Sequence, residues 1–148
     1  FFHPHAAIPD PLWSRGLGDV YKRQGYTYSG HPLAAAAGLA TLTVYEEEGL
    51  FARAKSLAPI LEEELQTIKG CPNVIDIRNY GLLGAVELQP IEGKPTARAM
   101  AVFRQCFDNG LLVRTTGDTI ALCPPLIASE DQVRTVVEKL KECLNSIG

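Results

Sequence analysis

One segment of the sequence has the residue types that suit a bound anion. A strongly helical stretch follows this run of hydroxyl residues and glycines, Gly25-Tyr26-Thr27-Tyr28-Ser29-Gly30-His31-Pro32. A helix N-terminus presents unpaired N–H groups and the positive end of the helix dipole, so the segment can hold an anion such as phosphate. Ser29 also fits an ordinary N-cap, and from the residues alone we favour this capping role over anion binding.

Arg114 is the second candidate for ligand binding. It stands at the end of a short apolar run that begins at Leu111 and approaches the turn Gly117-Asp118. A guanidinium held on a rigid strand can bind a carboxylate through two parallel hydrogen bonds. The alternative is a surface arginine that forms an ion pair with Asp118, and the sequence alone leaves both open.

The histidines and cysteines do not have the spacing of a metal site. His31 is more typical of a structural histidine in a first helical turn, and His3 and His5 lie in an irregular N-terminal segment. The four cysteines are far apart in the sequence and include no CxxC pair, so we expect no zinc site but free, mostly buried thiols in a reducing cytoplasm. They are Cys71, Cys106, Cys123 and Cys143.

Length and composition are those of one globular domain. The chain has 148 residues, of which 46% are hydrophobic and 21% charged, and its net charge is −3. Without a basic excess, a nucleic-acid-binding protein is not expected. The best apolar run, residues 32–45, is too short to cross a membrane, and no signal peptide is visible, so we expect a cytoplasmic protein.

The first 24 residues differ from the rest of the chain. Residues 1–12 contain several prolines and show no period, and residues 13–24 resemble a translated library-adapter scar. We therefore interpret residues 1–24 as non-native or disordered and exclude them from the fold. The alternative is a genuine mobile N-terminal arm.

Apolar periodicity from residue 29 onwards predicts alternating groups of helices and strands. We expect helices over residues 34–45, 54–68, 97–107 and 129–147, and strands over 74–77, 81–88, 111–114 and 119–123. Pro59 predicts a kink or two abutting helices, and Ser129 to Gln132 form a capping box. Helices packed on one face of a small antiparallel sheet would make a two-layer α+β domain.

Three of these segments, taken together, resemble class III pyridoxal-phosphate aminotransferases. The similarity is to the omega-amino acid:pyruvate group, which includes β-alanine:pyruvate enzymes. It covers residues 25–148 and is carried by three stretches: Gly25 to Ala34, Gly81 to Leu88, and Val113-Arg114-Thr115-Thr116-Gly117-Asp118 through Cys123-Pro124-Pro125-Leu126. Three such segments in register are specific.

The resemblance implies the C-terminal small domain of a fold-type I enzyme that works as a homodimer through its active-site interface. Such an enzyme transfers an amino group from an omega-amino acid or amine to pyruvate or another 2-oxo acid, with pyridoxal 5'-phosphate as electron sink. By resemblance, Thr27 and the backbone at Tyr26 bind the cofactor phosphate of the partner subunit. Arg114 recognises the substrate carboxylate and swings away for donors that lack one.

The sequence departs from this family in lacking the lysine that forms the Schiff base. That lysine lies well upstream of the phosphate-binding threonine, whereas here only Lys22 precedes Thr27, five residues away and inside the proposed scar. We therefore expect a fragment without the large domain, with no catalytic residue in this chain and no activity alone. The alternatives are a non-catalytic dimerisation or folding module, or another class III member such as a 4-aminobutyrate aminotransferase or an aminomutase.

We predict that residues 1–24 are dispensable for folding, because they have no periodic apolar face to bury. Urea denaturation of the whole chain and of a chain that begins at Gly25 should give the same midpoint. A loss of several kcal/mol on deletion would show instead that the segment is part of the fold.

Overall fold

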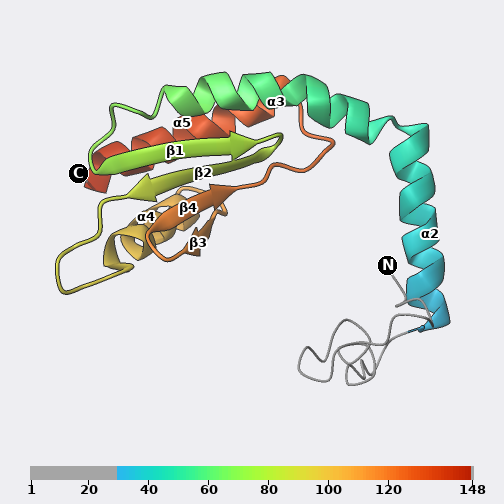
Figure 1. Ribbon diagram of the computed structural model, residues 1–148, viewed down its shortest axis with the longest axis horizontal. Helices are drawn as coiled ribbons and strands as arrows, with labels where there is room; N and C mark the ends of the chain where they lie inside the picture. Colours follow the sequence, from blue (N-terminus) through green and yellow to red (C-terminus); the bar gives the residue numbers. More distant parts are fainter. Residues whose placement is uncertain (1–29, 148) are drawn as a thin grey trace, which may run out of the picture. The chain divides into compact units, whose positions relative to one another are not determined.

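The computed structural model describes residues 30–147, and these form four helices and four strands (Figure 1). In chain order the elements are α2 (Pro32–Glu47), α3 (Leu50–Gln66), β1 (Val74–Tyr80), β2 (Leu83–Leu88), α4 (Ala97–Asp108), β3 (Arg114–Thr116), β4 (Thr119–Leu122) and α5 (Glu130–Ile147). The chain divides into two units, residues 1–43 and 44–148, so most of α2 is described separately from the rest.

The four strands form one antiparallel sheet in the order β1-β2-β4-β3. Two hairpins build it, and each is closed by a glycine with a left-handed backbone, Gly81 at φ 57° and Gly117 at φ 60°. The α4 helix connects β2 to the second hairpin, which returns to place β4 beside β2. The predicted α+β class with an antiparallel sheet is confirmed.

The helices of the second unit cover one face of this sheet. The α3 helix contacts β1 and β2, α4 contacts β3 and β4, and α5 packs against both helices (Figure 1). The largest fully buried side chains of this core are, by element, Leu61 and Leu65 of α3, Val86 and Leu88 of β2, Val102 and Cys106 of α4, Ile120 of β4, and Val133, Val137 and Leu140 of α5, together with Ile68. Removing each of the larger ones from water contributes about 1.5–3 kcal/mol.

The helix over Leu50–Gln66 is one element, so the prediction of two abutting helices at Pro59 is wrong. Proline removes one intrahelical hydrogen bond and leaves the carbonyl of Lys55, four residues earlier, without its N–H donor. Both residues lie on the exposed side of α3. Water can therefore satisfy that carbonyl, and the buried side of the helix continues past the proline.

A strand is predicted over residues 111–114, but in the structure β3 begins only at Arg114. Leu111 and Val113 are buried but do not pair in the sheet. The N–H of Leu111 instead donates to the carbonyl of Cys106 at 2.8 Å, which ties it to the end of α4. The sheet ladder therefore starts at Arg114, which pairs with Ala121.

The capping box before α5 is confirmed. The hydroxyl of Ser129 accepts a hydrogen bond from the N–H of Gln132 at 3.2 Å, and the Gln132 amide oxygen accepts one from the N–H of Ser129 at 2.9 Å. The pair satisfies two of the N–H groups that would otherwise be unpaired at the start of the helix.

None of the helices within residues 30–147 combines the length and the apolar character that a membrane span requires. The first of them, α2, nevertheless has an unusual composition. It carries no charged residue before Glu46, and none of its residues is buried. Leucines at positions 33, 39 and 42 are among its most exposed side chains.

We predict that Gly84→Ala destabilises the fold by about 1–3 kcal/mol through overpacking. A Cβ built at Gly84 would lie 2.6 Å from a Cδ of Leu65, so this fully buried side chain would have to shift against its neighbours in the core. The measurement is the urea midpoint of the chain. Gly70→Ala is the matched control, because a Cβ there meets no atom within 4 Å; equal effects of the two substitutions would contradict this account.

Candidate functional site

The structure places only some of the residues that the sequence singles out. Tyr26 and Thr27, the candidates for phosphate binding, lie outside the described residues, as does Ser29, the predicted N-cap. His31 directly precedes α2, and its carbonyl accepts the N–H of Ala35 at 3.0 Å. Phosphate binding by this segment therefore stays a prediction.

Arg114 lies on β3, at one edge of the sheet, and is exposed. Side chains alternate between the two faces of a strand. The next residue, Thr115, pairs with buried Ile120, and its hydroxyl lies 3.7 Å from the sulfur of Met100 on α4. Since Thr115 points towards the helices, Arg114 points to the opposite face.

That opposite face, which we call the open face, carries two rows of residues across the four strands. The strand register aligns them as Arg114, Ala121, Ala85 and Arg78 in one row, and Thr116, Thr119, Glu87 and Asp76 in the other. None of the eight side chains is buried. The open face is therefore polar, with two alanines in the centre of the row that begins at Arg114.

An ion-pair network uses two of the carboxylates of the open face. Asp76 and Glu87 stand directly opposite each other on β1 and β2, an arrangement that destabilises a sheet unless a cation intervenes. Arg78 supplies that cation, because its guanidinium lies 2.5 Å from the carboxylate of Asp76 and 2.7 Å from that of Glu87. The hydrogen bond with Glu87, and then that with Asp76, raises the pKa of Arg78 above its usual value.

The third carboxylate at the sheet, that of Asp118, points to a helix and not to Arg114. Its two oxygens lie 3.0 and 3.2 Å from the backbone nitrogen of Thr96, which immediately precedes α4. The alternative in which Asp118 forms an ion pair with Arg114 is therefore wrong. A carboxylate at a helix N-terminus is stabilised both by the free N–H groups and by the helix dipole, which explains why Asp118 binds there.

These three assignments leave the Arg114 guanidinium without a partner inside the described part of the chain. Between residues 30 and 147 no side chain or carbonyl forms a hydrogen bond or ion pair with it. Its neighbour in register, Ala121, has too short a side chain to cover it. A planar guanidinium in this position can bind a carboxylate of another molecule by donating two parallel hydrogen bonds to it.

The cysteines are free, as expected, and two of the buried ones, Cys71 and Cys106, are poor nucleophiles. Cys71, Cys106 and Cys143 are buried and Cys123 is exposed. Burial, and then the neighbouring Cys143 thiol, raises the pKa of Cys106 to about 12. Burial also raises the pKa of Cys71, against the opposing charge of Lys141. A thiol that stays protonated at neutral pH does not attack a substrate.

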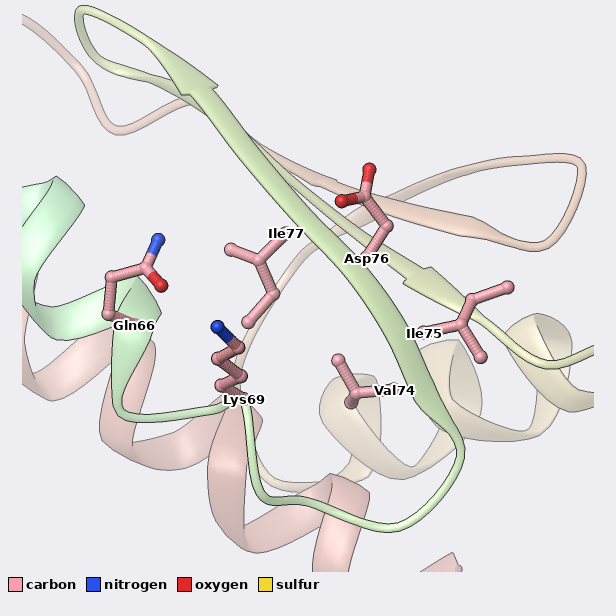
Figure 2. Close-up of a pocket in the computed structure, with 6 residues that line it drawn as sticks. All are labelled: Gln66, Lys69, Val74, Ile75, Asp76 and Ile77. Carbon is pink, nitrogen blue, oxygen red and sulfur yellow. The ribbon is translucent and has the colours of Figure 1, made fainter.

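A shallow cavity of about 140 Å³ lies between the end of α3 and the start of β1 (Figure 2). Val74 and Ile77 point into it towards Gln66 and Lys69, whereas Asp76 lies on the other side of the strand (Figure 2). Ligand sites of cofactor size usually measure 300–1,000 Å³, so this cavity does not fit pyridoxal phosphate. Arg114 does not line it.

Sequence reasoning identified Arg114 but missed how its surroundings are arranged. The pairing of Arg78 with two acids depends on the register of β1 and β2, including a shift between Val74 and Asp76. The one sequence signal for this pairing is the alternation of apolar and charged residues along β1 and β2. The bond between Asp118 and Thr96 joins residues 22 positions apart and has no sequence signal.

Comparison with known proteins gives a consistent result. The family described as aminotransferase class-III matches residues 13–144. An omega-aminotransferase from Caulobacter vibrioides is 51% identical over 123 residues, which are 83% of this chain and 28% of that protein. A beta-alanine–pyruvate aminotransferase from Pseudomonas aeruginosa is 40% identical over 84% of the chain and 28% of its own length.

A solved structure shows the same fold. The omega transaminase from Pseudomonas jessenii in complex with PMP matches with a TM-score of 0.77 and 33% identity, over 90% of this chain and 30% of that one. The chain thus spans somewhat more than a quarter of the length of these curated relatives. The family match starts inside residues 13–24, so their non-native origin stays a prediction. The family match extends over most of the chain, and the chain belongs to the class III aminotransferases, which depend on pyridoxal phosphate.

Proposed function

We propose that residues 25–148 form the C-terminal domain of a cytoplasmic, homodimeric transaminase in which Arg114 binds the carboxylate of the amino acceptor. The reaction moves an amino group from an omega-amino acid or amine to pyruvate or another 2-oxo acid. Support for pyruvate comes from the Pseudomonas aeruginosa relative, whose name specifies beta-alanine and pyruvate. The unpaired thiols support a reducing compartment.

The observation that carries this proposal is the guanidinium of Arg114 on a paired strand, which has no partner among residues 30–147. The carboxylates of Asp76, Glu87 and Asp118 are all bound to other groups. A 2-oxo acid therefore does not have to displace an internal ion pair before it binds. In this proposal Arg114 orients the acceptor by its carboxylate, so that the carbonyl carbon of the acceptor is presented in one direction.

Pyridoxal phosphate, when bound, supplies the electron sink for the transfer of the amino group. The cavity beside β1 is too small for it, and we assign its contacts on this chain to the segment just before α2. There Thr27 and the backbone at Tyr26 would bind the cofactor phosphate of the partner subunit. The hydroxyls and glycines of that segment, placed at a helix N-terminus, support this assignment.

A second candidate is a module for dimerisation or folding without catalysis of its own, and the α2 helix favours it. A helix that is apolar all round is normally buried in a larger structure, yet none of the residues of α2 is buried here. The exposed side chains of Leu33, Leu39 and Leu42 would suit packing against a second copy or a large domain. This role is compatible with the carboxylate-binding role of Arg114, since both require the rest of an enzyme.

We predict that the 148-residue chain alone is inactive, because it has no lysine placed to form the covalent link to the cofactor. The purified chain mixed with pyridoxal phosphate should show no stoichiometric cofactor binding by absorbance and should form no alanine from pyruvate. A variant with Lys22→Ala is the control. Turnover by the unmodified chain above this control would contradict the prediction.

We predict that Arg114→Ala lowers kcat/KM for pyruvate by about 100-fold, because a two-pronged contact to a charged group is lost. The host is a full-length chimera in which residues 25–148 replace the matching segment of the Caulobacter vibrioides omega-aminotransferase. The two half-reactions are measured separately, and the half-reaction with an amine donor that has no carboxylate should change little.

Arg114→Lys should recover little of this loss, because an ammonium group cannot reproduce the planar fork of the guanidinium. Arg104→Ala, which removes an exposed arginine from α4, serves as the control for the loss of one positive charge. If the amine and pyruvate half-reactions lose rate equally in Arg114→Ala, the arginine supports the fold and does not bind substrate.

A further inference from the structure

In the turn between β3 and β4, Asp118 makes two contacts with elements outside the hairpin. The backbone carbonyl of Asp118 accepts the N–H of Leu88 at 2.9 Å, which joins the turn to the end of β2. The side chain of the same residue accepts the N–H of Thr96, which joins the turn to the start of α4. Asp118 is therefore the point where hairpin, sheet and helix meet.

The strand that carries Arg114 is short and is held at both of its ends. It has three residues, lies at the edge of the sheet, and pairs on one side only, through Arg114, Thr115 and Thr116. At the Arg114 end, the preceding residue Val113 is buried, and β3 itself contacts α4, in part through the weak bond between the Thr115 hydroxyl and the Met100 sulfur. At its other end, the position of β3 depends on how firmly the turn Gly117-Asp118 is held.

The backbone at the other end of the Asp118 bond is strained. Thr96 has φ 67°, a left-handed conformation that is rare for a β-branched residue and persists only where surrounding contacts impose it. In this conformation the Thr96 N–H is aimed at both oxygens of Asp118. The same contact prevents Asp118 from turning towards Arg114, four residues earlier in the chain.

From these contacts we infer that Asp118 is a positioning residue for Arg114: it holds the hairpin to the start of α4 and keeps its own carboxylate away from the guanidinium. This inference rests on the proposed function of Arg114. In this inference, Asp118 binds Thr96 and not Arg114, so that Arg114 can bind the carboxylate of the acceptor.

Three variants separate this role from a general effect of charge or stability. Asp118→Asn removes the charge but keeps an oxygen that can accept the Thr96 N–H. Asp118→Ala removes both. Asp76→Ala is the control, because it removes an exposed carboxylate at the opposite edge of the same sheet. If Asp118→Ala does not fold, Asp118→Ser replaces it, since serine suits a turn but is too short to reach the amide.

The first measurement is hydrogen exchange of the Thr96 amide in the 148-residue chain. Asp118→Ala should accelerate exchange at Thr96, whereas Asp118→Asn and Asp76→Ala should leave it near the unmodified rate. Unchanged exchange in Asp118→Ala would show that the bond to Thr96 does not hold the turn, and would overturn the inference without reference to activity.

The second measurement uses the full-length chimera and the two half-reactions. Asp118→Ala should raise KM for pyruvate about tenfold, as expected for a displaced binding group, with kcat and the amine half-reaction unchanged. Asp118→Asn should behave as the unmodified enzyme. Equal losses in both half-reactions, or equal effects of Asn and Ala, would overturn the inference. If Arg114→Ala shows no selectivity for pyruvate, the proposed function fails instead, whatever Asp118 does.

Discussion

The sheet is buried on one face only, and the alternation of side chains along its strands determines what the other face can carry. On β2 and β4 the buried positions are Gly84, Val86, Leu88, Ile120 and Leu122, which face the helices. The residues between them, and the partners of those residues on the edge strands, must then point outward. Arg114 reaches the open face for this reason, and a shift of one residue in register would place it in the core.

Arg114 is free to bind a ligand because the acids near the sheet bind other groups of the domain. The open face has two arginines, and the acids close to the sheet are Asp76, Glu87 and Asp118. Arg78 satisfies two of these acids, and a helix N-terminus satisfies the third. Of the two arginines on the open face, Arg78 is thus held by acids of this domain, whereas Arg114 has no partner among the described residues and can bind an anion from outside, as a substrate-binding arginine must.

Sequence reasoning was successful where local chemistry decides the structure. The capping box at Ser129 and the turn at Gly117 follow from the residues present. Apolar periodicity located α3, α4 and α5, and helix propensity located α2. It failed where a choice depended on distant partners. Pro59 is tolerated because one side of α3 faces solvent, and Leu111 is withdrawn from the sheet by a carbonyl of α4.

The same division applies to the candidate site. The type and position of Arg114 were visible in the sequence, because an arginine between a strand and a Gly-Asp turn is a local pattern. Its lack of an internal partner was not visible, because the turn aspartate binds Thr96 on another element. Local spacing suggests an ion pair between residues 114 and 118, and only the packing of α4 against the hairpin shows otherwise.

The irregular start of β1 has a consequence for the behaviour of the protein in solution. An edge strand exposes unpaired N–H and C=O groups and can recruit a strand from another molecule. Here the register shifts between Val74 and Asp76, and charged side chains follow at Asp76 and Arg78. A bulge twists an edge away from a flat partner, and fixed charges oppose stacking in register. The longer edge of the sheet is thereby protected against edge-to-edge aggregation.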